Sequence, residues 1–132
     1  MENQTQNQSS AQKKKILFIE DDKIFQRIIK ETLTENDFGY VGAYDGDSGL
    51  KLAEEESPDL ILLDILLPNK NGFEVLYELK ASPRLKSTPV IILSNLDGAQ
   101  NRNKAEDLGV TKFLNKTDYL PDDIIEEIKQ VL

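Results

Sequence analysis

Short apolar runs alternate along the chain with stretches in which apolar residues recur every three or four positions. Three runs, residues 16–19, 60–63 and 90–93, are continuously apolar. Runs of this kind are typical of strands buried on both faces of a parallel sheet. Two weaker runs, residues 40–43 and 111–114, complete a set of five predicted strands.

The stretches between and after the strands predict helices, each with an apolar face. Four are marked by spacings of three and four: Ile24, Phe25, Ile28, Ile29 and Leu33; Leu50 and Ala53; Phe73, Leu76 and Leu79; and Ile124, Ile125, Ile128 and Leu132. Residues 97–108 predict a weaker helix with few apolar positions. We expect that helix to pack lightly and to move easily.

Residues that start and stop helices support these boundaries. Asp22 is expected to cap the first helix, Gly39 to stop it, Ser57 and Pro58 to close the second, and Pro121 to lie in the first turn of the last. Strands that alternate with helices predict a doubly wound α/β domain. For five parallel strands we expect the flavodoxin-like order 2-1-3-4-5, with helices on both faces.

The first residues differ from the rest of the chain. Residues 1–12 are almost wholly polar and precede three lysines. A segment with so little to bury is expected to be disordered. We therefore predict a disordered tail over residues 1–14 and one domain over residues 15–132.

Composition removes several classes of function. The 132 residues include 16 Lys and Arg against 24 Asp and Glu, a net charge of -8, and no Cys or His. The chain therefore has no thiolate nucleophile, iron–sulfur site, Ser-His-Asp triad, His-ligated metal or phosphohistidine. The acidic balance argues against direct nucleic-acid binding. No apolar run is long enough to span a membrane or mark a secretory signal, so we expect a cytoplasmic protein without membrane insertion.

Polar residues follow the predicted strands at their carboxyl ends. Glu20 and Asp21 follow the first strand, Asp64 the third, Ser94 the fourth, and Lys116 the fifth. In the order 2-1-3-4-5 the first and third strands are neighbours at the switch point, where ligands bind in such folds. Converging carboxylates take up protons or bind a cation, and oxygen ligands favour Mg²⁺. An Asp beside Mg²⁺, a Lys and a Ser can act as a nucleophile toward a phosphoryl group.

Each of these residues also has an ordinary structural interpretation. Asp64 is compatible with a loop acid, Ser94 with a strand end and Lys116 with a solvated loop lysine. Phe113 is more typical of a core residue in a generic α/β domain. Their joint occurrence at one sheet edge favours the functional interpretation.

At these residues the chain resembles the receiver domain of two-component response regulators. The similar segments are ILFIEDD at residues 16–22, LILLDILLPNKNG at 60–72, PVIILS at 89–94 and GVTKFLNK at 109–116. The resemblance covers residues 15–132. It implies a signalling domain, as in stand-alone chemotaxis-type regulators.

The resemblance also implies a role for each site residue. Asp64 would accept a phosphoryl group from the phosphohistidine of a sensor histidine kinase or phosphotransfer protein. The Mg²⁺ ligands would be Asp21, Asp64 and the backbone carbonyl of Leu66, with Glu20 acting mainly through water. Lys116 would pair with the acyl phosphate, Ser94 would move toward it, and Phe113 would turn inward. A downstream protein would bind the face made by the helix at 97–108, the strand at 111–114 and the last helix.

Two other functions stay open from the sequence. One is a Mg²⁺-dependent phosphohydrolase with an Asp nucleophile, although such enzymes carry a second Asp two residues later, where this chain has Leu66. The other is an interaction module that works without phosphorylation. In the favoured interpretation the protein is a phosphoprotein and not a true enzyme, limited to self-phosphorylation from phosphodonors and slow self-dephosphorylation.

Overall fold

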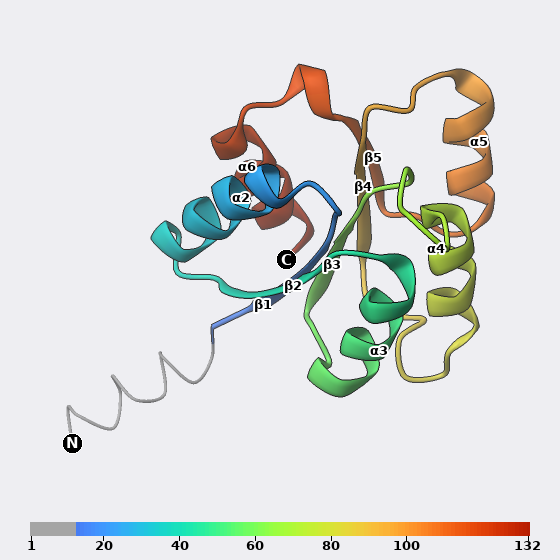
Figure 1. Cartoon of the computed structure of the whole chain (residues 1–132), viewed down its shortest axis with the longest axis horizontal. Helices are drawn as coiled ribbons and strands as arrows, with labels where there is room; N and C mark the ends of the chain where they lie inside the picture. The colour runs from blue at the N-terminus through green and yellow to red at the C-terminus, as the bar shows by residue number, and fades with distance from the viewer. Residues whose placement is uncertain (1–12) are drawn as a thin grey trace.

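Five parallel strands form one sheet in the order β2-β1-β3-β4-β5 (Figure 1). The structure is a computed structural model that describes residues 13–132, so most of the predicted disordered tail lies outside the described residues. The strands are β1 (Lys15–Ile19), β2 (Gly39–Ala43), β3 (Leu60–Leu63), β4 (Val90–Ser94) and β5 (Lys112–Asn115). The predicted order is confirmed, and each predicted strand lies within one residue of its observed bounds.

Helices cover both faces of the sheet, as predicted. On one face lie α2 (Lys23–Glu35) and α6 (Pro121–Val131); on the other lie α3 (Gly46–Glu56), α4 (Gly72–Ala81) and α5 (Ala99–Asp107) (Figure 1). A short 3-10 helix, η1 (Lys116–Asp118), connects β5 to the last helix. From Ile16 onward in β1, and throughout β3 and β4, the side chains are wholly buried between the two helical layers. Their continuous apolar runs follow from this burial on both faces.

The buried face of α2 differs from the predicted one. Ile29 and Leu33 are buried, but Ile24 is 74% exposed and Ile28 is 40% exposed. The five apolar positions span too wide an arc to face the sheet together, and the buried stripe of α2 includes the polar residue Gln26. The five apolar residues of α2 therefore do not form one buried face.

The predicted ends of the helices are confirmed at all positions except one. The Asp22 carboxylate caps α2 by accepting from the N–H groups of Ile24 and Phe25, Ser57 ends α3 in the left-handed region, and Pro121 opens α6. Gly39 does not stop α2, because that helix ends at Glu35 and Gly39 begins β2. Asp37, with φ 66°, supplies the left-handed turn instead.

The helix α5 packs lightly, as expected. Ala105 is its only buried residue, and its first turn has no side-chain cap. Gly98 precedes it with φ 106°, a conformation that favours glycine. Among residues 13–132, no helix has the length and hydropathy needed to cross a membrane.

Candidate functional site

Three carboxylates meet at the carboxyl ends of β1 and β3. Ile19 and Leu63 are paired residues of these neighbouring strands, and the acids Glu20, Asp21 and Asp64 follow them. One carboxylate oxygen from each acid lies within 4.8 Å of the other two. Glu20 and Asp64 are buried, whereas Asp21 is exposed. The structure thus brings together the three acids that the sequence placed at this edge.

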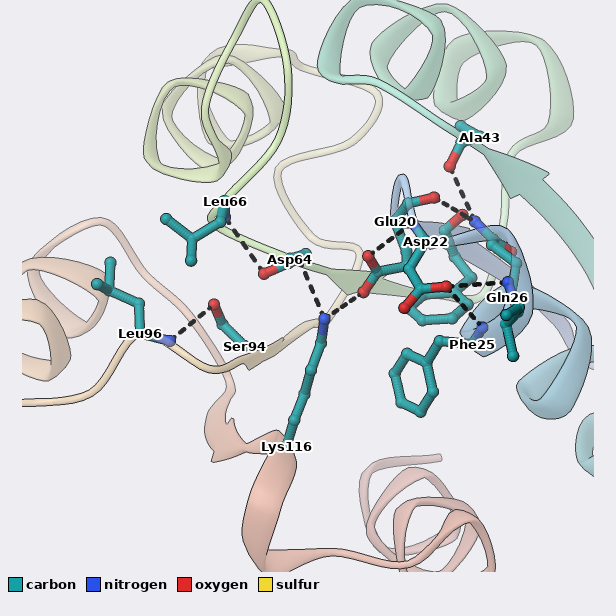
Figure 2. A network of polar contacts seen from close by, with 12 residues as sticks. Glu20, Asp22, Phe25, Gln26, Ala43, Asp64, Leu66, Ser94, Leu96 and Lys116 are labelled. Atoms are coloured by element: carbon teal, nitrogen blue, oxygen red, sulfur yellow. Dashed lines mark hydrogen bonds and ion pairs between the residues drawn. The ribbon is translucent and has the colours of Figure 1, made fainter.

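Backbone N–H groups hold the two buried carboxylates in place (Figure 2). The N–H of Asp22 donates to Glu20 Oε2 at 3.0 Å, and the N–H of Leu66 donates to Asp64 Oδ1 at 3.2 Å. Each of these bonds leaves the second oxygen of the carboxylate for other partners. The loop after each strand therefore fixes the orientation of its acid.

Lys116 joins the two buried acids. Its Nζ lies 2.6 Å from Glu20 Oε1 and 3.2 Å from Asp64 Oδ2 (Figure 2). The same ammonium lies 5.2 Å from the centroid of the Phe25 ring, a distance at which a cation is attracted to the aromatic face. The side chain reaches the acids from the start of η1 and is only 17% exposed.

The protonation of this cluster follows from its burial. Burial raises the pKa of Glu20 from its ordinary value of 4.5 to about 7, against the opposing effects of Lys116 and the Asp22 N–H, while the Asp64 charge adds to the rise. Burial lowers the pKa of Lys116, but its contacts with Glu20 and Asp64 outweigh that effect and leave the pKa above the ordinary value. Lys116 therefore carries a charge at neutral pH, and Glu20 titrates near neutrality.

The oxygen atoms of the cluster suit a hard divalent cation. Glu20 Oε1 is buried and accepts no well-aligned hydrogen bond within residues 13–132, although it forms the close ion pair with Lys116. A buried carboxylate oxygen in this situation gains from a cation. Carboxylate oxygens from three residues, one of them exposed to water, match the preference of Mg²⁺ for oxygen ligands and retained waters.

Ser94 lies at the end of β4, the strand next to β3. Its side chain is wholly buried, and its Oγ accepts from the N–H of Leu96 at 3.2 Å (Figure 2). The hydroxyl hydrogen is not used in that bond, so it can be donated to another acceptor.

Phe113 lies one strand farther away, on β5. Its ring is half-buried against the core on the α3, α4 and α5 side of the sheet. Arg102 of α5 covers this ring, with its guanidinium carbon 4.8 Å from the ring centroid, and its Nη1 donates to the Phe113 carbonyl at 3.1 Å. The structure thus places Phe113 beside α5 and does not bring it to the acid cluster.

Two features near the site were missed by the sequence analysis. The first is Gln26, a buried side chain whose Nε2 donates to the carbonyls of Phe18, Glu20 and Ala43 at 2.9–3.0 Å. It ties α2 to the ends of β1 and β2 (Figure 2). The sequence signal for this role was the position of Gln26 among the regularly spaced apolar residues of α2.

The second missed feature is a polar cluster that connects α5 to β5. Asp97 lies 3.5 Å from Arg102 and accepts from the Asn115 side chain at 3.1 Å. Hydrogen bonds from the Gly98 N–H and from Asn115, together with the Arg102 charge, lower the pKa of Asp97. No sequence spacing indicates these contacts, because they join residues from separate elements.

Comparison with known proteins agrees with this fold. The family model described as response regulator receiver domain matches residues 16–129. The transcriptional regulatory protein CiaR of Streptococcus pneumoniae is 39% identical over 116 residues, which cover 87% of this chain and 48% of CiaR. Response regulator PleD of Caulobacter vibrioides is 33% identical over 102 residues, which cover 77% of this chain and 22% of PleD. The chain therefore spans about half or less of the length of these curated relatives.

Solved structures give the same result. The BeF3-activated N-terminal receiver domain of Klebsiella pneumoniae RstA superposes with a TM-score of 0.81 at 29% identity, covering 88% of this chain and 96% of that one. The Mn(2+)-bound form of response regulator Rcp1 gives a TM-score of 0.76 at 31% identity, covering 89% and 91%. From the family match, the relatives and the shared sheet order, the chain belongs to the response regulator receiver domains.

Proposed function

We propose that this receiver domain is a signalling switch that accepts a phosphoryl group on Asp64. The donor is the phosphohistidine of a sensor histidine kinase or phosphotransfer protein. The observation that carries this proposal is the position of Lys116, whose ammonium contacts both Asp64 and Glu20 inside a cluster of three carboxylates. The 132 residues contain no histidine, so the phosphohistidine lies outside this sequence.

The proposed transfer forms one bond and breaks another. An oxygen of the Asp64 carboxylate attacks phosphorus, the P–N bond to the donor imidazole breaks, and the imidazole keeps the electron pair and takes up a proton. Asp64 Oδ1 accepts from the Leu66 N–H and Oδ2 accepts from Lys116, both at 3.2 Å, so the ammonium lies beside the attacking carboxylate. Lys116 then stabilises the charge on the phosphoryl oxygens.

A divalent metal completes the proposed site. Asp21, Asp64 and the Leu66 carbonyl would hold Mg²⁺, with Glu20 acting through water. When bound, the ion neutralises charge on the phosphoryl oxygens. The convergence of carboxylate oxygens from Glu20, Asp21 and Asp64 supports this assignment, as does the Mn(2+)-bound form of Rcp1 among the similar structures.

The signal is proposed to travel through Ser94 and Phe113. Ser94 would donate its hydroxyl to a phosphoryl oxygen, and Phe113 would turn inward as the surroundings of Ser94 change. The light packing of α5 supports a change in this region, because Ala105 is the only buried residue of this helix. A downstream protein would bind the face made by α5, β5 and α6. A cytoplasmic location stays a prediction.

Phosphorylation can be tested directly with small phosphodonors. The protein is incubated with Mg²⁺ and acetyl phosphate and its mass is measured, and beryllofluoride binding is followed by amide NMR. We expect a gain of one phosphoryl mass and shifts around Asp64, Ser94 and Phe113 in the wild type. Asp64→Asn should show neither, whereas Asp59→Asn, which changes an acid at the opposite end of β3, should behave as wild type. An equal response in Asp64→Asn would overturn the assignment of Asp64.

A further inference from the structure

A basic groove lies between α2 and the edge strand β2, on a protein whose net charge is -8. The groove encloses about 300 Å³ and is lined by Lys23, Gln26, Arg27, Lys30, Tyr40 and Tyr44. Its three cations are exposed. Within residues 13–132, none of the three forms an ion pair with an acidic side chain. The groove therefore concentrates positive charge at one edge of an acidic molecule.

Buried contacts give the groove a fixed floor. The Tyr40 hydroxyl donates to Gln26 Oε1, and Gln26 is itself held by three backbone carbonyls. The Lys30 ammonium lies 5.7 Å from the centroid of the Tyr40 ring. Gly42 makes this arrangement possible, because a Cβ at that position would lie 2.1 Å from the Tyr40 hydroxyl. These neighbours thus fix the position of the Tyr40 side chain in the groove.

Within residues 13–132, the same edge offers backbone groups that pair with no other strand. The Gly39 N–H donates to Lys14, and the Ala43 carbonyl accepts from Glu20, so alternate residues of β2 bond to β1. The N–H and C=O groups of successive residues in a strand point alternately to its two sides. The N–H and C=O groups of Tyr40 and Gly42 therefore point away from the sheet, since β2 is its terminal strand. Such an edge can pair with an additional strand.

The spacing of the cations along α2 is of the same order as the repeat of a strand, although it is shorter. Lys23, Arg27 and Lys30 are three to four residues apart on α2, which corresponds to rises of about 6 and 4.5 Å along a helix. Side chains on one face of an extended peptide repeat about every 6.8 Å. An extended segment paired with β2 would direct every second side chain into the groove, toward these cations.

We propose that the edge of β2 and the basic groove bind an extended acidic segment of a partner protein, which adds as a sixth strand to the sheet. Carboxylates at alternate positions of the segment would pair with Lys23, Arg27 and Lys30. Its backbone would pair with Tyr40 and Gly42. This binding needs neither Asp64 nor phosphorylation, so it is independent of the proposed switch.

A labelled peptide with alternating Thr and Glu residues tests the proposal. Fluorescence anisotropy should detect binding of this peptide to the full chain, but not of the same peptide with Lys in place of Glu. Arg27→Glu should weaken binding roughly tenfold or more, because it places like charges together. Lys51→Glu makes the same charge change at an exposed site on α3, across the sheet, and should have little effect. Equal affinity of the two variants would overturn the proposal.

Amide exchange measured by NMR tests the strand pairing. Both variants should first give folded-state spectra, since the substituted side chains are exposed. In the wild type, peptide binding should slow exchange at the Tyr40 and Gly42 amides and leave Val41, which already faces β1, unchanged. If the peptide binds without slowing exchange at these two amides, it does not add as a strand, and charge attraction alone accounts for the binding. If the free protein forms dimers and Arg27→Glu abolishes them, the groove binds a second copy of the chain, and the proposal of an acidic partner is overturned.

Discussion

The guanidinium of Arg102 lies over the Phe113 ring, with its carbon 4.8 Å from the ring centroid, and its Nη1 donates to the Phe113 carbonyl at 3.1 Å. One side chain of a lightly packed helix therefore holds both the ring and the backbone of β5. Asp97 adds a third contact, 3.5 Å from the same guanidinium. Any inward movement of the Phe113 ring must first break its contact with Arg102.

Removing Arg102 should loosen α5 relative to β5. Arg102→Ala is expected to lower the free energy of unfolding by about 1 kcal/mol, from one stacking contact and one hydrogen bond. Amide exchange in α5 should accelerate more than in α2. Arg102→Lys, which keeps the charge but loses the planar group, is the matched variant and should have an intermediate effect. Unchanged exchange in α5 would show that Arg102 does not restrain the helix.

The metal-free domain should lose stability as pH rises toward neutrality. The unfolded chain releases the Glu20 proton near pH 4.5, whereas the folded chain holds it to about pH 7. Retention of this proton stabilises the folded state fully below pH 4.5, and this stabilisation of roughly 3 kcal/mol is lost by pH 8. Urea unfolding with a chelator at pH 5, 6, 7 and 8 measures the change.

Glu20→Gln is the control for this pH effect, because glutamine does not titrate. Its stability relative to wild type should rise from pH 5 to pH 8. Added Mg²⁺ should stabilise the wild type more at pH 8 than at pH 5, since the cation and the proton compete for the carboxylates. If the free energy of unfolding has the same pH dependence in the wild type and in Glu20→Gln, the raised pKa of Glu20 is contradicted.

Lys116 should be needed for stability when no metal is present. Lys116→Met leaves Glu20 and Asp64 as buried acids without their shared cation, at an expected cost of about 3 kcal/mol at pH 8. Mg²⁺ should bind this variant more tightly, because a competing positive charge has been removed, and calorimetry measures that affinity. Lys129→Met breaks an exposed pair with Glu126 and should cost less than about 1 kcal/mol. Similar losses in the two variants would refute a structural role for Lys116.

Gly72 should resist substitution because it packs against the backbone of the Asp64 loop. A Cβ at this position would lie 2.3 Å from the Asp64 carbonyl oxygen and 2.6 Å from Ile65 Cα. Gly72→Ala is expected to cost about 1–3 kcal/mol and to shift the Asp64 and Ile65 amide signals. At Gly39 the nearest atom would be 3.7 Å away, so Gly39→Ala should be nearly neutral. Equal stability of the two variants would contradict this difference.

The sheet and most of the acid site could be predicted from local sequence, for a simple physical reason. A strand buried on both faces must be apolar throughout, and the polar residue that ends it must lie at the sheet edge. Leu60, Leu63 and Asp64 illustrate both effects within one short segment. The order of the strands then determines which acids become neighbours.

The missed features depend on contacts that span separate elements. Ile24 and Ile28 satisfy helical spacing, yet the buried arc of α2 is centred elsewhere and includes Gln26. Arg102 acts on Phe113 only because α5 lies beside β5 in the folded chain. Spacing along one element carries no information about such partners.

The three bonds donated by Gln26 have a consequence for local unfolding. One buried amide is shared by the backbone of Phe18, Glu20 and Ala43, so the first turn of α2 cannot fray away from β1 and β2 without breaking all three. These segments should therefore open as one cooperative unit, with nearly equal opening free energies. The loop that carries Glu20 and Asp21 is thereby among the slowest parts of the surface to open, although it faces water.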